Sequence, residues 1–291
     1  MEHLVSTHRT RTVTVDGGEL TVGEWGDPGA LPLIAIHGIT SSHLAWAHVA
    51  AALPERRVIA PDLRGRGRSN ELPGPYGMPR HAADLLRLLD DLGLERAQLT
   101  GHSMGAFVAA ATAALAPDRV SSVVLVDGGL PLRDPPGGDV EAAVRASLGP
   151  ALERLSMTFA DSAAYRAFWA AHPAFGGEFD AEMLAYIDYD LVGDPPHPSS
   201  KADAVAQDSV QFYGDPPAQT IDAIRAPMRL LWAPRGLLNE TPGMYTGTEL
   251  ARWRERWPAI AMREVDDVNH YTILMSARGA AEVAAEVRQA G

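Results

Sequence analysis

Short apolar runs alternate with helical patterns along most of the chain. Eight runs predict β-strands, at residues 11–15, 19–25, 33–36, 57–60, 97–100, 120–126, 228–232 and 260–265. The first two flank Asp16-Gly17-Gly18, which is typical of a hairpin turn. Apolar positions at helical spacing predict helices at residues 43–53, 79–92 and 106–116. Strands that alternate with helices indicate an α/β protein with a parallel sheet and helices on both faces.

One long region departs from this alternation. Residues 130–219 contain no convincing apolar strand, and helical stretches at 140–160, 162–171 and 181–191 are separated by prolines. We interpret residues 130–219 as a helical cap inserted into a core formed by residues 1–129 and 220–291. Most of its aromatic side chains are expected to pack the cap against the core, and a few to line an apolar pocket.

Composition and charge narrow the classes of function. The chain has 291 residues, 46% of them hydrophobic, and a formal net charge of −12. Such a charge argues against nucleic acids and anionic membranes as partners, because both attract clustered Lys and Arg. The absence of cysteine rules out disulfides and thiolate chemistry. Residues 1–11 are polar and lack an apolar signal core, so we expect a cytoplasmic protein that neither crosses nor binds a membrane.

The pentapeptide Gly101-His102-Ser103-Met104-Gly105 carries the clearest chemical signal. It fits the G-x-S-x-G pattern and lies between a predicted strand and a predicted helix. Glycines on both sides leave room for the sharp turn that presents a serine there. The start of the helix supplies free backbone N–H groups where an oxyanion would form. We therefore predict that Ser103 is a nucleophile.

A serine hydroxyl needs a base to accept its proton, and His270 is the best candidate. It follows a predicted strand and a short polar loop, near the end of the chain. His102 and His37 are interpreted as structural residues that shape their loops.

Four motifs together resemble the α/β-hydrolase superfamily, in the capped group that includes serine carboxylesterases. They are His37-Gly38-Ile39-Thr40, the segment Asp62-Leu63-Arg64-Gly65-Arg66-Gly67-Arg68-Ser69, the Ser103 elbow and Asn269-His270. The resemblance implies a mostly parallel eight-stranded sheet with helices on both faces and an inserted helical cap. It also implies that the backbone N–H groups of Ile39 and Met104 form the oxyanion hole. Ser103 at the elbow argues against epoxide hydrolases and dehalogenases, which use a carboxylate there.

The acid of the triad departs from the superfamily's usual pattern. A Gly-x-x-Asp turn is expected after the strand at 228–232, but glycine, Gly236, stands at the expected position. Asp127 follows the strand at 120–126, and Glu240 lies farther along the loop that contains Gly236. Either carboxylate could orient His270. We favour Asp127 and keep Glu240 as the alternative.

These residues predict a serine hydrolase that cleaves a small apolar carboxylic ester or lactone through an acyl-enzyme. The alternatives are C–C bond hydrolysis or cofactor-free perhydrolysis on the same triad, and a ligand-binding receptor that keeps a hydrolase-like pocket. The arginines at 64, 66 and 68 are interpreted as structural. No dinucleotide fingerprint, phosphate loop or metal-ligand cluster is present in the sequence, so we expect no cofactor and no metal. The oligomeric state is left open.

Overall fold

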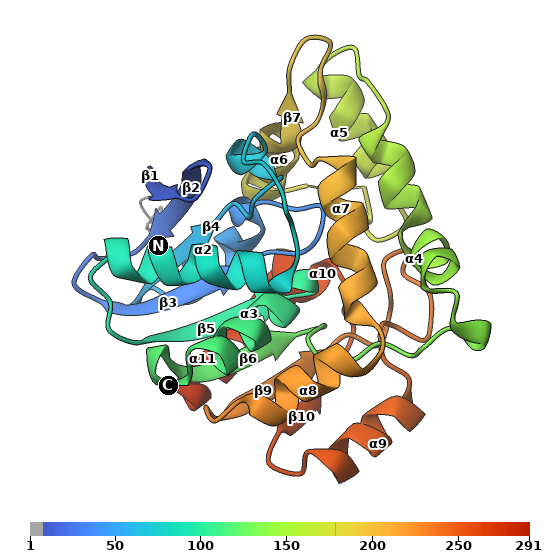
Figure 1. Ribbon diagram of the computed structural model, residues 1–291. Coiled ribbons are helices and arrows are strands. Elements are labelled where there is room, and N and C mark those ends of the chain that lie inside the picture. The colour runs from blue at the N-terminus through green and yellow to red at the C-terminus, as the bar shows by residue number, and fades with distance from the viewer. Residues whose placement is uncertain (1–7, 178) are drawn as a thin grey trace.

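A central sheet of eight strands organises the computed structural model, which describes residues 8–177 and 179–291. The strand order is β1-β2-β4-β3-β5-β6-β9-β10 (Figure 1). The strands are β1 (Arg9–Val15), β2 (Gly18–Trp25), β3 (Leu31–Ile36), β4 (Arg56–Pro61), β5 (Ala97–His102), β6 (Val120–Val126), β9 (Met228–Trp232) and β10 (Ala261–Glu264). In this sheet the pairs β1–β2 and β2–β4 are antiparallel and the other five pairs of neighbours are parallel, so the predicted mostly parallel eight-stranded sheet is confirmed.

The period of two along each strand separates two hydrophobic cores. In β3, Ile34 and Ile36 belong to one buried cluster, while Leu33 and Ala35 belong to the other. Successive side chains of a strand point to opposite faces, so a strand buried on both sides reads as a continuous apolar run. The central strands are recognisable in the sequence for this reason.

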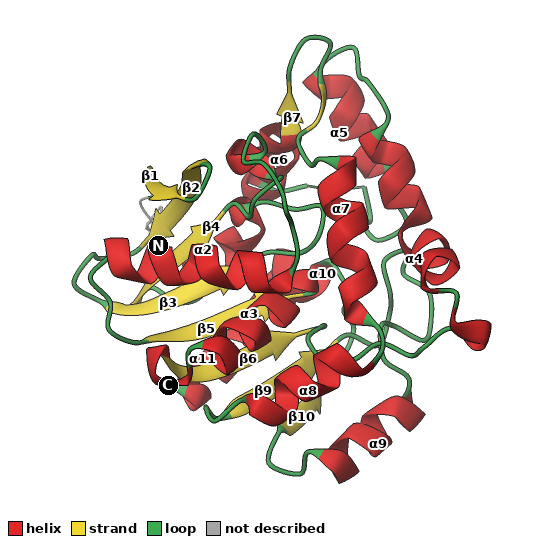
Figure 2. Ribbon diagram, viewed as in Figure 1, coloured by secondary structure: helices red, strands yellow, loops and turns green. Residues whose placement is uncertain are grey.

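Helices cover both faces of the sheet (Figure 2). The first core lies under α2 (Met78–Asp91), α3 (Met104–Leu115) and α8 (Asp215–Ala223). The second lies under α1 (Ala47–Ala51), α10 (Thr272–Met275) and α11 (Ala277–Ala290). Helix α9 (Gly247–Arg256) adds Leu250 and Trp253 to the first core. The predicted helix at 43–53 is split into a 3₁₀ turn, His43–Trp46, and the short α1.

The segment between β6 and β9 is mainly helical. It contains α4 (Val140–Leu155), α5 (Ser162–Ala170), α6 (Ala181–Asp190) and α7 (Ala202–Ser209), followed by α8. Helices α4 to α7 stand together at one end of the sheet in Figure 1. The structure places α4 to α6 close to the predicted helical stretches, although α4 ends five residues earlier than 160 (160 − 155 = 5).

Four elements of this segment, two helices and two short strands, were not predicted from the sequence. Helix α7 is short and has few apolar positions, so its pattern is weak. Helix α8 contains Pro216 and Pro217, which suggest a break in the sequence but occupy the first turn of the helix. Proline is tolerated there, because the N–H groups of a first turn have no partner within the helix. A two-stranded ladder joins β7 (Leu191–Val192) to β8 (His197–Pro198), and strands of two residues leave no readable alternation.

A few residues of the predicted core and of the predicted cap lie outside the part of the chain that the structure describes. They are residues 1–7, which belong to the predicted core domain, and residue 178, which belongs to the predicted cap. Across the helices that the structure does describe, none is both long and apolar enough to cross a membrane.

Candidate active site

Ser103 occupies a strained turn between β5 and α3. Its backbone has φ 54° and ψ −122°, a conformation that L-residues rarely adopt. The turn is tight because a Cβ on Gly101 would lie 2.1 Å from the Gly105 carbonyl oxygen, and one on Gly105 would lie 2.0 Å from that of Ile36. Both glycines of the motif are thus required by close backbone approach.

His270 is paired with Asp127 below the serine loop. Its Nδ1 lies 2.6 Å from Asp127 Oδ2, so the ring N–H donates to the carboxylate. The Asp127 side chain is fully buried, and its Oδ1 accepts a hydrogen bond from the Ala233 N–H at 3.0 Å. In the neutral imidazole, this arrangement makes Nε2 the nitrogen that can accept a proton.

Glu240, the alternative acid, is engaged elsewhere. Its side chain accepts a hydrogen bond from the Leu238 N–H at 2.7 Å, and its carbonyl oxygen accepts one from Gly236. The carboxylate therefore closes its own turn at an exposed position. Within residues 8–177 and 179–291, no hydrogen bond or ion pair joins it to His270. The structure brings Asp127, and not Glu240, to the histidine.

Hydrogen bonds from side chains to backbone groups fix the loop that carries His270. His102 Nε2 donates to the His270 carbonyl oxygen at 2.8 Å, and burial holds the pKa of His102 well below its usual value. The amide oxygen of Asn269 accepts from the N–H groups of Tyr271 and Thr272. His102 is thus a structural neighbour of the nucleophile, as interpreted from its place in the motif.

His37 shapes the loop that follows β3. Its Nδ1 donates to the Gly38 carbonyl oxygen at 2.7 Å, and its Nε2 accepts from the Leu63 N–H at 2.8 Å. A ring with one donor and one acceptor nitrogen is neutral. Burial, the main cause, lowers the pKa of His37 to about 4. This neutral ring holds the Gly38–Ile39 backbone in place.

Ile39 and Met104 lie beside Ser103, as the motif positions imply. Met104 is the first residue of α3, so its N–H has no partner within the helix. The loop before Ile39 comes close, since a Cβ on Gly38 would lie 3.3 Å from Ser103 Cβ. The structure therefore places a helix N-terminus and a loop backbone around the serine.

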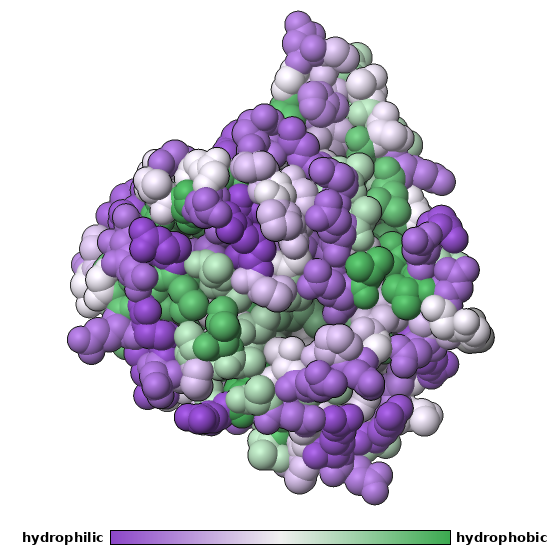
Figure 3. Space-filling view, in the orientation of Figure 1, coloured by the Kyte–Doolittle hydropathy of each residue, from purple (hydrophilic) through white to green (hydrophobic). Residues whose placement is uncertain are grey.

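A cavity of about 390 Å³ opens above these residues. Its size lies within the usual range for sites that bind small molecules. Ser103, His270 and Ile39 line the floor, and α4 supplies apolar wall residues, namely Ala143, Val144, Ala146, Leu148, Pro150 and Ala151. Figure 3 shows apolar surface beside α4 on a largely hydrophilic face. An apolar substrate fits such a lining.

Two further residues support the site and are not identified from the sequence. A Cβ on Gly128 would lie 2.3 Å from the Ser103 carbonyl oxygen, so only glycine fits there. The Tyr245 hydroxyl donates to the Leu130 carbonyl oxygen at 3.0 Å and accepts from the Leu130 N–H at 3.1 Å. The pair Gly128-Gly129 directly after Asp127 is a signal that could have identified the first, whereas nothing near Tyr245 points to its partner.

One group of possible metal ligands occurs among the described residues. His48, Asp180 and Glu182 lie on the surface, and the two carboxylates are exposed. Asp180 is already used, because it accepts from His48 Nε2 at 2.7 Å and from the Met183 N–H at the start of α6. The group does not line the cavity that contains Ser103.

The sheet order, the serine elbow and the paired histidine together define an α/β-hydrolase fold. The chain matches the family model described as alpha/beta hydrolase fold over residues 32–276. The protein belongs to this family.

Individual relatives differ in the reactions that their names state. "Epoxide hydrolase A" of Mycobacterium tuberculosis is 42% identical over 117 residues, which cover 39% of this chain and 36% of that protein. "Lipase LipV" of the same species is 33% identical over 174 residues, or 57% and 63% of the two chains. The matched segments thus span only part of each relative.

Solved structures agree on the fold over nearly the whole chain. The structure of E-2-(acetamidomethylene)succinate hydrolase superposes with a TM-score of 0.81 at 23% identity, covering 98% of this chain and 100% of that one. An esterase from Thermogutta terrifontis gives 0.64 at 23% identity, with 98% and 97% covered. At such identities these likenesses concern the fold alone.

Proposed function

We propose that this protein is a serine hydrolase that cleaves a carboxylic ester or lactone through an acyl-enzyme. The observation that carries the proposal is the buried pair of His270 Nδ1 and Asp127 Oδ2, 2.6 Å apart, which lines the same cavity as Ser103 through His270. Ser103, rather than a carboxylate, at the elbow favours acyl transfer over the epoxide chemistry of the relative named above.

The mechanism assigns one role to each residue. Ser103 Oγ attacks the acyl carbonyl carbon while His270 Nε2 accepts its proton. Asp127 holds the imidazole in the required tautomer and stabilises its charged form. The N–H groups of Ile39 and Met104 stabilise the oxyanion of the tetrahedral intermediate.

Release and deacylation use the same groups in reverse. His270 donates its proton to the leaving alcohol, which departs and leaves the acyl group bonded to Ser103. A water molecule then attacks this ester while His270 accepts one of its protons. Breakdown of the second intermediate returns the proton to Ser103 Oγ and releases the carboxylic acid.

We also propose that residues 130–219 act as a cap that selects the substrate, over a core of residues 1–129 and 220–291. Support comes from the cavity lining, in which α4 contributes the apolar wall while the core contributes the reacting groups. A small apolar ester fits this division, since its acyl or alkyl part would lie against α4.

The test is steady-state turnover of p-nitrophenyl esters of increasing acyl length by the wild type and by Ser103→Ala. The proposal predicts turnover by the wild type that is lost in Ser103→Ala, with both proteins folded by circular dichroism. Turnover that survives Ser103→Ala would contradict it. Turnover of β-diketones or of peroxide with acetate, but of no ester, would instead assign C–C hydrolysis or perhydrolysis to the same residues.

A further inference from the structure

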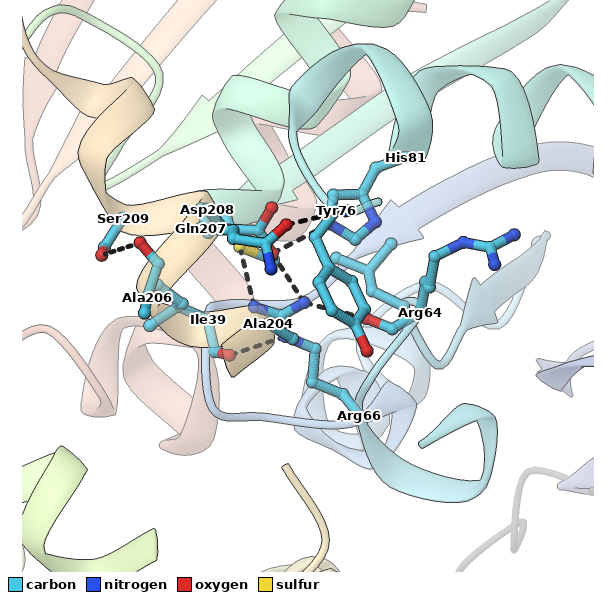
Figure 4. A network of polar contacts seen from close by, with 12 residues as sticks. Ile39, Arg64, Arg66, Tyr76, His81, Ala204, Ala206, Gln207, Asp208 and Ser209 are labelled. Carbon is cyan, nitrogen blue, oxygen red and sulfur yellow. Dashed lines mark hydrogen bonds and ion pairs between the residues drawn. The ribbon is translucent and has the colours of Figure 1, made fainter. Parts of the chain in front are cut away.

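Arg66 is buried beneath the proposed oxyanion hole. Its side chain is 0% exposed and comes from the loop after β4. Its Nε donates to the Ile39 carbonyl oxygen at 2.8 Å (Figure 4). Its Nη2 lies 3.6 Å from Met104 Sδ. These contacts involve the same two residues whose N–H groups are proposed to bind the oxyanion. One guanidinium thus touches both halves of the oxyanion hole from behind.

The charge of Arg66 is matched by a residue from outside the core. Asp208 lies on α7, and its Oδ2 is 2.7 Å from Arg66 Nη1. The same oxygen is 3.0 Å from His81 Nε2 on α2, and all three side chains are fully buried. Burial alone would raise the pKa of Asp208, but the neighbouring Arg66 and His81 hold it below its usual value. Figure 4 shows this contact between α7 and the core loop.

The same end of α7 reaches the cavity. Ser209, the residue after Asp208, lines it, and so does Phe212 in the turn that follows. A substrate in the cavity therefore touches the element that holds Arg66. A chain of residues runs from the cavity wall at Ser209 to its neighbour Asp208, and from there by direct contacts to Arg66 and to Ile39 and Met104.

Stability alone does not explain this ion pair. Two charges lose their hydration on burial, and well-packed apolar residues of similar volume often serve at least as well. The planar fork of Arg66, in contrast, gives each N–H a fixed direction, which suits a role in positioning backbone groups.

We propose that Arg66 is a positioning residue that sets the backbone of Ile39 and Met104 for oxyanion binding, and that Asp208 makes this alignment depend on the seating of α7. The inference rests on the proposed function and adds a coupling between the cap helix and the transition-state site. An oxyanion hole must be correct to a fraction of an ångström, so loss of this support is expected to lower kcat more than substrate affinity.

The test compares variants of two buried pairs from the same loop. Asp208→Asn removes the charge that holds Arg66, and Arg66→Lys keeps a charge near Asp208 while removing the Nε donor to Ile39. The matched control is Asp84→Asn, which weakens the buried pair of Arg64 and Asp84 at 2.8 Å, a pair that touches neither oxyanion residue. If Asp208→Asn does not fold, Arg66→Lys carries the test.

Two readouts are measured for each variant. The first is kcat and KM for a p-nitrophenyl ester. The second is the dissociation constant of phenylboronic acid, which is determined from the shift in Tm that this compound causes. Ser103 Oγ bonds to boron, its proton passes to His270, and one boronate oxygen then occupies the oxyanion position. This second readout does not depend on turnover.

We expect Asp208→Asn and Arg66→Lys to lower kcat by about 10- to 100-fold with a much smaller change in KM, and to weaken boronate binding by a similar factor. Asp84→Asn should lower Tm but leave both readouts close to wild type. Equal effects of Asp208→Asn and Asp84→Asn, or a change confined to KM, would overturn the inference. Failure of the proposed function is distinct, because it shows as ester turnover that survives Ser103→Ala.

Discussion

The core and cap halves of the cavity are held together in different ways. In the core half, backbone hydrogen bonds hold the two reacting residues: the Ser103 N–H donates to Val126 O at 2.9 Å, and the His270 N–H donates to Arg235 O at 2.9 Å. In the cap half, contacts between side chains hold the helices together, as in the ion pair of Arg154 Nη1 on α4 and Asp190 Oδ2 on α6 at 2.5 Å. A backbone hydrogen bond is kept in most substitutions, whereas a side-chain contact is lost when either of its residues is replaced. Under the proposed function, the core would therefore fix the chemistry, and the cap would be the part in which specificity is most easily altered.

Side-chain hydrogen bonds also connect the core half to the cap half. Tyr189 on α6 donates its hydroxyl to Asp62 Oδ2 at 2.7 Å, and Asp62 accepts from the His43 and Arg68 N–H groups as well. Burial would raise the pKa of Asp62, but His43 and the hydrogen bonds to its carboxylate lower it to about 2. Through Asp62 and Arg66, one loop of the core thus contacts both α6 and α7.

The largest expected effect separates the two candidate acids. Asp127→Asn is expected to lower kcat by about 10⁴-fold, because an amide favours the wrong imidazole tautomer. Glu240→Gln should leave kcat nearly unchanged, since Glu240 contacts its own turn rather than His270. Ester turnover by the purified variants measures both. A collapse in Glu240→Gln with an active Asp127→Asn would assign the acid to Glu240.

A glycine substitution tests how rigid the core half is. In Gly128→Ala the new Cβ would lie 2.3 Å from Ser103 O and 2.7 Å from Ser103 Cα, so the nucleophile must move. We expect kcat to fall by about 100-fold, as is typical when a reacting group is misplaced by about 1 Å. Gly149→Ala on α4 is the control, because its Cβ would meet nothing within 4 Å. Equal kcat values for the two variants would show that the elbow tolerates displacement.

A smaller effect is expected when the cap wall is changed. Ala151 on α4 lines the cavity, so Ala151→Phe fills part of it. We expect kcat/KM for esters with long acyl chains to fall by about 10-fold, with little change for p-nitrophenyl acetate, because the lost space is remote from the reacting atoms. Ala163→Phe, at an exposed position of α5, adds the same ring outside the cavity. A series of p-nitrophenyl esters measures the selectivity, and an unchanged chain-length profile in Ala151→Phe would argue against the cap as the selecting element.

The mildest prediction concerns pH and the core loop. The pKa of His37 is about 4 in the folded protein and about 6.5 when unfolded, so only the unfolded chain binds a proton between these values. Stability is therefore lost as pH falls below about 6.5, by about 2 kcal/mol from His37 between about pH 7 and pH 5. Urea unfolding at the two pH values measures this loss. His37→Gln should show a smaller loss than wild type, and an equal loss would assign the effect to other groups.

The strands of the core were predictable from sequence, whereas core helix α9 and parts of the cap were not. All eight strands of the sheet were predicted, because strands such as β3 and β6 are buried on both faces and read as apolar runs. Helices α7 and α8 were missed, since one has few apolar positions and the other begins with prolines. Short helices in a cap owe their structure to tertiary packing more than to local pattern.

The site shows the same division. Ser103, His270, Ile39 and Met104 could be singled out because each lies in or beside a local motif. The acid stayed open because its identity depends on the order β6-β9-β10 in the sheet, which brings Asp127 after β6 and the His270 loop after β10 to the same loop after β9. Arg66 was interpreted as structural, and its contact with Asp208 has no local signature, because the partner lies on a distant helix.

Covalent trapping of the nucleophile tests the central claim most directly. The wild type and His270→Gln are treated with a fluorophosphonate, the rate of adduct formation is followed by intact mass, and the modified residue is located by peptide sequencing. The account predicts a single adduct on Ser103 in the wild type and labelling slowed by at least about 100-fold in His270→Gln, since general-base assistance is lost. An adduct on another residue, or equal rates in the two proteins, would contradict it.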